Sequence, residues 1–148
     1  MKIAIASDHA GYSLKTQLVE LMRTKGHEVI DLGVETDAVP SDYPDTARTV
    51  SAAILEGRAE RGILCCGSGI GVSVAANKIK GIYCGLAHDT YSAAQGVRHD
   101  NMNVLAIGAR VVGVALAEAI MDAFLGAEFD TATERYGRRF NMVKALEK

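Results

Sequence analysis

The sequence predicts an α/β fold, a single-domain Rossmann-like three-layer α/β/α sandwich with a five-stranded parallel sheet. Short apolar runs rich in β-branched residues alternate with stretches whose apolar residues recur at helical spacing. This alternation favours right-handed βαβ crossovers, and the nearly continuous apolar character of the runs is typical of parallel strands buried on both faces. With 148 residues the chain is expected to form one domain, spanning 1–148.

Five runs account for the predicted sheet. The expected strands are KIAIA at 2–6, EVIDL at 28–32, GILCC at 62–66, IYCGLA at 82–87 and NVLAI at 103–107. Ligands of open parallel sheets bind beyond the carboxyl ends of the strands. Functional residues are therefore expected in the loops that follow these runs.

The helices are predicted from apolar spacing and from helix-ending residues. An apolar stripe at i, i+4, i+7 and i+8 begins at Leu14, and Pro44 suits the first turn of a second helix that ends near Gly57. The remaining helices are expected over 70–78, over about 89–98, up to Gly126 and over 134–146. The last helix is basic, and we expect it to reach a partner subunit.

Composition disfavours several classes of function. A net charge of −2 and a pI near 6.1 give no electrostatic footprint for nucleic acid or an anionic membrane. No apolar run approaches a membrane span, and the N-terminal MKIAIASDHAGY turns polar too early for a signal peptide, so a cytoplasmic protein is expected. The three cysteines include an adjacent pair, which disfavours a disulfide framework, and no spacing indicates a metal site or a cofactor.

The segment CCGSGIGVSVAANK, residues 65–78, follows the third expected strand and opens a helix. Gly67, Gly69 and Gly71 allow positive φ and close backbone approach, so the turn can present several N–H groups to an anion. The spacing matches neither a P-loop nor the G-x-G-x-x-G dinucleotide fingerprint. A plain tight turn between strand and helix remains the alternative.

Cys66 is expected to end its strand facing the ligand crevice, beside a helix N-terminus that favours the thiolate. A thiolate beside aligned amides can remove a carbon-bound proton while the amides hold the developing oxyanion. A small buried thiol is the competing interpretation. Cys65 should face the other side of the sheet, and both Cys65 and Cys84 are expected in the core.

Other loops at the same edge carry polar side chains. Asp8 and His9 follow the first strand, where an aspartate often only caps a helix and a histidine is often structural. Asp42 and Tyr43 precede a helix start, where capping and packing explain them as well as ligand contact does.

The segment RHDNMN, residues 98–103, concentrates hydrogen-bonding side chains at a helix-to-strand turn. Its His99 can titrate near neutral pH and move a proton. We interpret His27 as a surface residue and His88 as a helix cap.

Arginines occur where a phosphate group would need them. Arg110 follows the fifth strand, and Arg135 and Arg139 lie at i, i+4 on one face of the last helix. Planar guanidinium groups suit phosphate recognition, although a solvated basic face is the commoner reason for such a pattern.

Together these segments resemble the ribose-5-phosphate isomerase B family, relatives of the galactose-6-phosphate isomerase subunits. The matching segments are SDHAGYSLK, SDYP, GILCCGSGIGVSVAANK and RHDNMNVLAIGARVVG, followed by the basic tail. They cover nearly the whole chain in the family's order, and the glycine segment with AANK is the most specific of them. Val72 stands where some relatives have a glutamate, which indicates the cysteine type.

The resemblance implies a metal-free, cofactor-free aldose–ketose isomerase that interconverts ribose 5-phosphate and ribulose 5-phosphate through an enediolate. It implies that Cys66 is the base, that His99 opens the furanose ring, and that Ser68 with the amides of 67–71 stabilises the enediolate oxygen. The implied substrate-binding residues are Asp8, His9, Tyr43, Gly67, Gly69, Ile70, Gly71, Asn77, Asp100, Arg110, Arg135 and Arg139. Family members are dimers or tetramers with active sites between subunits, so a homodimer or homotetramer is expected.

Three departures from the family pattern bear on the substrate. Asp100 stands where asparagine is common, Tyr136 replaces a common histidine, and a short insertion falls across 128–135, which makes Arg138 an alternative to either tail arginine. A four-carbon tetrulose phosphate or a six-carbon allose or galactose 6-phosphate stays open as the substrate, and so does a non-catalytic sugar-phosphate-binding module. A flavodoxin-like carrier is disfavoured, because Asp8 alone makes no acidic cluster.

Overall fold

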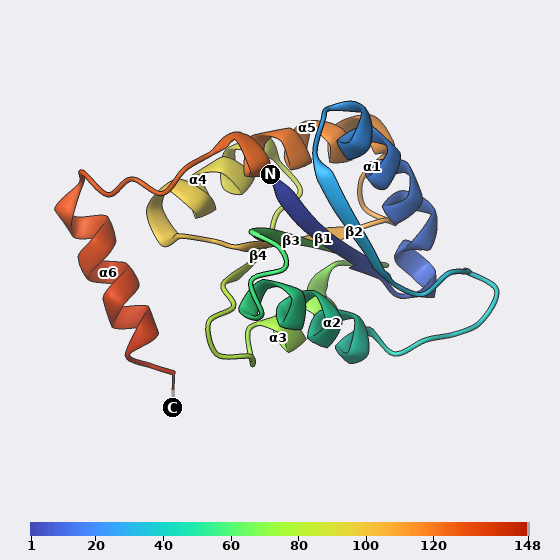
Figure 1. Cartoon of the computed structure of the whole chain (residues 1–148), viewed down its shortest axis with the longest axis horizontal. Helices are drawn as coiled ribbons and strands as arrows, with labels where there is room; N and C mark the ends of the chain where they lie inside the picture. Colours follow the sequence, from blue (N-terminus) through green and yellow to red (C-terminus); the bar gives the residue numbers. More distant parts are fainter. Residues whose placement is uncertain (148) are drawn as a thin grey trace.

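The chain forms three layers, with a parallel sheet between two layers of helices (Figure 1). This computed structural model describes residues 1–147. Within these residues the sheet has five strands in the order β2-β1-β3-β5-β4, and each neighbouring pair is parallel. The strands are β1 (Lys2–Ser7), β2 (Glu28–Gly33), β3 (Arg61–Cys66), β4 (Cys84–Leu86) and β5 (Val104–Gly108). The predicted fold class is confirmed.

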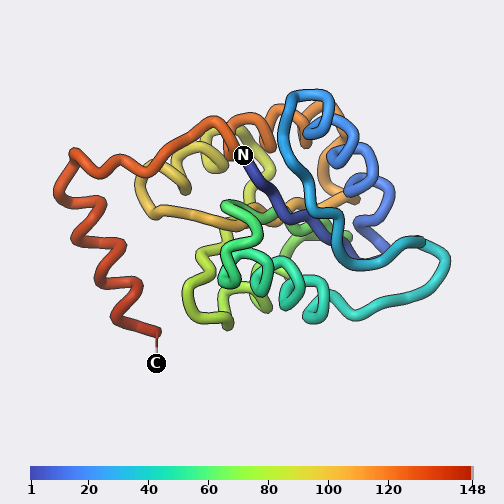
Figure 2. Tube along the Cα trace, in the orientation of Figure 1, coloured from blue at the N-terminus to red at the C-terminus, as the bar shows by residue number. Residues whose placement is uncertain are grey.

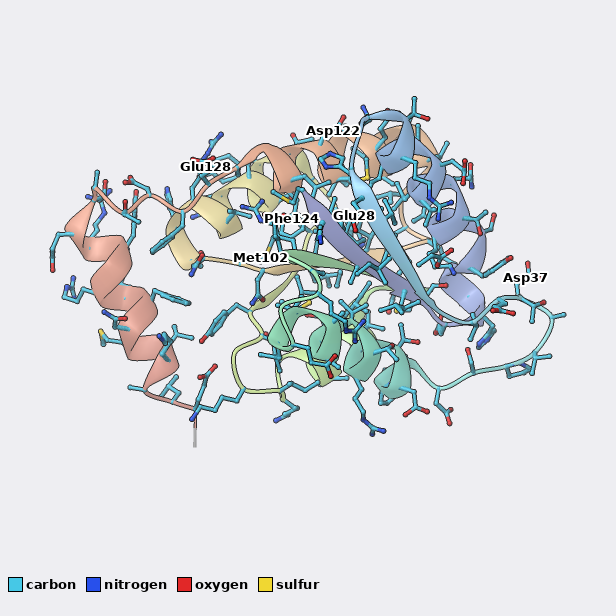
Figure 3. The ribbon with its side chains drawn as sticks, in the orientation of Figure 1. Glu28, Asp37, Met102, Asp122, Phe124 and Glu128 are labelled. Atoms are coloured by element: carbon cyan, nitrogen blue, oxygen red, sulfur yellow. The ribbon has the colours of Figure 1, made fainter. Side chains whose placement is uncertain are left out.

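Helices cover both faces of the sheet, as its apolar strands require. One face carries α1 (Tyr12–Thr24), α4 (Thr90–Asp100) and α5 (Val114–Gly126), and the other carries α2 (Tyr43–Leu55) and α3 (Ile70–Ala76). The hydrophobic core is divided by the sheet in the same way. Phe124 is fully buried between α5 and the sheet (Figure 3), whereas Val50 of α2 is fully buried on the opposite face.

The last helix, α6 (Glu134–Lys144), stands at one end of the molecule, and the loop between β2 and α2 extends at the other (Figure 2). The α6 helix is anchored by Phe140, whose ring centroid lies 4.8 Å from that of Tyr83 and 5.7 Å from that of Phe129. The position of α6 against the rest of the molecule is therefore set by this aromatic packing as well as by the connection to α5.

At the other end of the molecule, Asp37 lies exposed on the loop between β2 and α2 (Figure 3).

The fourth strand is shorter than predicted. The apolar run suggested 82–87, but the strand spans Cys84–Leu86, and side-chain amides accept the N–H groups of Tyr83 and Cys84. Asn103 Oδ1 accepts the N–H of Tyr83 at 2.8 Å, and Asn77 Oδ1 accepts the N–H of Cys84 at 2.8 Å. Cys84 thus begins an edge strand, and it is a partly buried residue that packs against the core cluster beneath α2 and α3.

Two predicted helices end two residues early. The third helix ends at Ala76 instead of residue 78, because Asn77 caps it and turns the chain toward β4. The sixth helix ends at Lys144 instead of residue 146.

A short 3-10 helix, His9–Gly11, follows β1 and brings the chain against the end of β3. Asp8 starts it by accepting the Gly11 N–H at 3.0 Å. A Cβ atom at Gly11 would overlap the carbonyl group of Cys65 and lie 2.8 Å from the Cys66 nitrogen. Glycine is therefore required at this position for close backbone approach, not for an unusual φ.

We predict that Gly11→Ala destabilises the protein by about 3 kcal/mol, the upper end of the usual cost of overpacking, because backbone must move. Urea unfolding followed by circular dichroism measures the change. The control is Gly137→Ala, which adds the same methyl group within α6 where no atom lies within 4 Å. That control should keep or slightly raise stability. Equal midpoints for the two variants would contradict the packing argument.

Candidate active site

A cavity of about 430 Å³ lies at the carboxyl ends of β1, β3 and β5. We call it the Cys66 pocket. Its lining residues are Asp8, His9, Ala10, Tyr43, Cys66, Gly67, Ser68, Gly71, Arg110 and Val111. Segments far apart in the sequence meet there because the strands that precede them are neighbours in the sheet. All but two of the lining residues, Ala10 and Val111, are among those singled out from the sequence.

Cys66 and Cys65 face opposite sides of the sheet, as their alternation in β3 predicted. Cys66 packs in the core cluster beneath α2 and α3, and Cys65 packs in the cluster beneath α1 and α5. Burial raises the pKa of the Cys65 thiol to about 12. Cys66 is 5% exposed and lines the pocket, where its Sγ accepts the Gly69 N–H at 3.0 Å. The glycine turn therefore presents an amide to the sulfur.

The turn after β3 is fixed against the end of β5. The N–H groups of Ala109 and Arg110 donate to the carbonyl oxygens of Cys66 and Gly67, at 2.8 and 3.0 Å. Gly69 adopts a left-handed conformation with φ of 80°, and a side chain there would strike Leu86. Only glycine fits both the conformation and the space at this position.

The same turn brings Arg110 over the pocket. A Cβ atom at Gly67 would lie 3.5 Å from Arg110 Nη1, so the guanidinium group covers the backbone beside Cys66. Ser68 also lines the pocket, and its Oγ accepts the Ile70 N–H at 3.2 Å. A cation, a hydroxyl group and a thiol thus share one small cavity.

His9 is held by a residue that the sequence did not single out. The backbone N–H of His9 donates to Ser41 Oγ at 2.9 Å, and the N–H of Ser41 donates to His9 Nδ1 at 3.1 Å. Because Nδ1 is an acceptor, the remaining ring hydrogen of a neutral His9 sits on Nε2. The segment SDYP contained Ser41, but no sequence spacing relates it to a histidine 32 residues earlier.

Asp8 and Tyr43 complete the pocket. Asp8 is 7% exposed and both caps the short 3-10 helix and lines the cavity, so the two interpretations of this residue are compatible. Tyr43 is 44% exposed, and its ring lies against Gly71, where a Cβ atom would come within 3.0 Å of it. Tyr43 therefore forms a wall that requires a glycine opposite.

The other predicted catalytic residue, His99, does not line the Cys66 pocket. It lies near the end of α4 in a separate hollow of about 390 Å³ with Thr90, Tyr91 and Arg98. Its ring stacks on Tyr136 of α6, with centroids 4.0 Å apart and planes 16° apart. Within one chain Cys66 and His99 thus line different cavities.

Several predicted binding residues also lie outside the Cys66 pocket. Asp100 and Arg139 line a third cavity, of about 340 Å³, between β4 and α6. Asn77 lines it too, and its side chain bridges Ser73 and both backbone groups of Cys84. Ile70 is 56% exposed and does not line the pocket. Arg135 is exposed on α6.

Two interpretations of polar residues change with the structure. His88 is not a helix cap: its Nε2 accepts the Gly108 N–H at 2.9 Å, and Asp89 caps α4 instead. In the polar turn at 98–103, two asparagines have structural roles: one ends a helix and the other forms hydrogen bonds with backbone groups. Asn101 ends α4 with φ of 53°, and Asn103 joins Gly81 to Tyr83.

Within residues 1–147, no three histidine, cysteine, aspartate or glutamate side chains gather as metal ligands would. In the same part of the chain, no helix has the length and apolar character needed to cross a membrane.

We predict that iodoacetamide at pH 8 alkylates Cys66 in the native protein and spares Cys65 and Cys84. Burial raises the pKa of Cys65 and of Cys84 to about 12, so their reactive thiolates are scarce at this pH. Tandem mass spectrometry of the peptide that follows Arg61 locates the label. Cys66→Ser is the control, because it keeps Cys65 in the same peptide. Label on Cys84, or uptake by the control, would contradict the prediction.

Comparison with known proteins identifies the family. The Ribose/Galactose Isomerase family matches residues 3–143. Ribose-5-phosphate isomerase B of Escherichia coli is 42% identical over 146 residues, which are 99% of this chain and 96% of that protein. D-erythrulose-4-phosphate isomerase of Pectobacterium atrosepticum is 42% identical over 130 residues, which are 88% of this chain and 86% of that one.

A solved structure agrees with these sequence matches. Ribose-5-phosphate isomerase B of Mycoplasma genitalium with bound ribulose-5-phosphate superimposes with a TM-score of 0.92 at 39% identity. The superposition covers 99% of this chain and 95% of that one. The glycine turn, the pocket that it borders and these matches over nearly the full length lead to one conclusion: the chain belongs to the Ribose/Galactose Isomerase family.

Proposed function

We propose that the protein is an aldose–ketose isomerase that interconverts ribose 5-phosphate and ribulose 5-phosphate. The observation that carries this proposal is the position of Cys66, whose sulfur lines a polar cavity and accepts a backbone amide from the glycine turn. A cavity of about 430 Å³ suits a small phosphosugar. Relatives named for ribose 5-phosphate over nearly the whole chain support the same substrate.

The proposed chemistry needs one base and one oxyanion site. The Cys66 thiolate takes the proton from C2 of the open aldose, and the electron pair forms a C1–C2 double bond as negative charge develops on O1. Ser68 and the turn amides offer hydrogen bonds to that oxygen. Cys66 then returns its proton to C1 while the hydroxyl proton moves from O2 to O1, which gives the ketose with no atom gained or lost.

The phosphate group is proposed to lie with groups of the site that can donate hydrogen bonds. Arg110 and the Nε2 side of His9 are available at the Cys66 pocket. Guanidinium groups bind phosphate oxygens through paired hydrogen bonds. Arg135 and Arg139 are proposed as the remaining phosphate ligands, and His99 as the residue that opens the furanose ring.

These last three residues are proposed to come from a second copy of the chain. In one chain they lie outside the Cys66 pocket. Beside the glycine turn, Ile70, Val74 and Leu86 are 56%, 57% and 39% exposed, which leaves apolar surface that a second copy would cover. A two-fold dimer would bring the same surfaces together twice, so each dimer would hold two complete sites.

We predict that folded wild-type protein converts ribose 5-phosphate to ribulose 5-phosphate, and that Cys66→Ser lowers the rate by about 10²–10⁴-fold, the usual worth of a general base. Proton NMR in D₂O follows both the formation of ribulose 5-phosphate and deuterium uptake at its C1. Cys65→Ala is the control, because Cys65 lies beneath the opposite face of the sheet and should leave turnover intact.

Undiminished turnover by Cys66→Ser would remove Cys66 as the base. The same assay with D-erythrulose 4-phosphate decides the alternative raised by the four-carbon relative. Turnover of that sugar and not of ribose 5-phosphate would keep the isomerase and change its substrate. Binding of both sugars by folded wild type without turnover would favour the non-catalytic module.

We predict that inactive Cys66→Ser and inactive His99→Ala proteins restore activity when they are mixed and refolded together. Random pairing makes half of the dimers mixed, and each mixed dimer holds one intact site of two. About a quarter of wild-type activity should therefore return. Either variant refolded alone is the control. Continued inactivity of the mixture, with mixed dimers shown by native mass spectrometry, would place Cys66 and His99 of one chain in the same site.

A further inference from the structure

Tyr136 is buried on a helix that is otherwise largely exposed. It is 8% exposed, and no other residue of α6 is buried. Its ring lies on the His99 ring, with centroids 4.0 Å apart and planes 16° apart. An aromatic pair at this spacing contributes about 0.5–1.5 kcal/mol beyond its area burial. The α6 helix therefore meets α4 through the residue proposed to open the sugar ring.

The same tyrosine contacts a proposed phosphate ligand. Arg135 Nη2 donates to the Tyr136 hydroxyl oxygen at 3.1 Å. The Arg135 guanidinium carbon also lies 4.8 Å from the centroid of the Tyr136 ring. A free arginine side chain samples many rotamers, so this contact restricts an otherwise exposed guanidinium group.

His99 is held at an edge as well as at a face. Gln95, one helical turn earlier in α4, places its Nε2 3.0 Å from His99 Nδ1. An amide nitrogen is a donor, so Nδ1 accepts and the other ring nitrogen, Nε2, carries the hydrogen of the neutral ring. The stack on Tyr136 and the bond from Gln95 together fix the direction in which Nε2 points.

The position of Tyr136 is itself set by contacts on both sides of it. Before it, Asp130 N–H donates to the Arg98 carbonyl oxygen at 3.0 Å, which ties the α5–α6 connection to the end of α4. After it, Phe140 packs on Tyr83, and Glu147 accepts the Gly81 N–H at 2.9 Å. Tyr136 is thus part of an anchored helix and not of a loose tail.

We propose that Tyr136 is a positioning residue that holds His99 and Arg135 as one preassembled unit. The ring fixes the imidazole and the hydroxyl fixes the guanidinium, so one side chain sets both ring opening and phosphate binding. This inference rests on the proposed function. The ring of Tyr136 holds His99 and its hydroxyl holds Arg135, so a substitution can remove one of these contacts and keep the other.

Tyr136→Phe keeps the ring and removes the hydroxyl. It should raise KM for ribose 5-phosphate about tenfold, because a hydrogen bond to a charged group is lost, and leave kcat unchanged. Tyr136→Leu keeps apolar bulk and removes the stack, so it should lower kcat in addition. Tyr12→Phe, which removes a hydroxyl from α1 far from these residues in sequence, is the control and should change neither constant. Equal losses of kcat in the Phe and Leu variants would overturn the proposal.

Two readouts do not depend on turnover. In wild type and in Tyr136→Phe, the ring current of residue 136 should move the His99 ring protons upfield in the proton NMR spectrum, and Tyr136→Leu should abolish that shift. His99→Asn assigns the signal. The dissociation constant of inorganic phosphate, from NMR titration, should rise about tenfold in Tyr136→Phe. Absence of the upfield shift in wild type, or unchanged phosphate affinity in Tyr136→Phe, would overturn the proposal even if wild type proves to be an active isomerase.

Discussion

The backbone hydrogen bonds between the turn after β3 and the end of β5 are the constraint on which the candidate site depends. Ala109 and Arg110 donate to Cys66 and Gly67, so the glycine turn cannot move independently of the loop after β5. These bonds form because β5, and not β4, is the neighbour of β3 in the sheet. Without that strand order, Arg110 would not lie over the backbone beside the thiol.

The sequence predicted well the features that depend on local chemistry. The apolar runs and their alternation with helical spacing predicted the five strands and the single domain's α/β architecture, and the family matches confirm the resemblance. The alternation of side chains along a strand also placed Cys65 and Cys66 on opposite faces. Each of these features follows from residues within one element, where spacing alone decides which face a side chain takes.

Contacts between distant segments were not predictable in the same way. Ser41 reaches His9 across 32 residues, and Gly108 reaches His88 across 20 residues. His99 drew attention as a titratable residue, but its stack on Tyr136 depends on where the connection between α5 and α6 leads. Sequence periodicity has no bearing on the path of such a connection, so the distribution of the site residues over three separate cavities required the structure.

The contacts around α6 support our proposal of Arg135 and Arg139, and not Arg138, as phosphate ligands. Arg138 lies 3.7 Å from Glu134, one helical turn earlier, with both side chains largely exposed, so its charge faces a carboxylate in solvent. Arg135 is bound to Tyr136, and Arg139 faces the cavity between β4 and α6. Arg135 and Arg139, at i and i+4, thus contact a buried tyrosine and line a cavity, whereas Arg138 pairs with an exposed carboxylate.

Asp100 lines the same cavity as Arg139, between β4 and α6. His99, its neighbour in sequence, lines a different hollow. A carboxylate beside a guanidinium group lowers the net positive charge offered to a phosphate, and the effect weakens with distance. If Arg139 holds the phosphate, as proposed, the aspartate at position 100 bears more on how the sugar phosphate is held than on how its ring is opened.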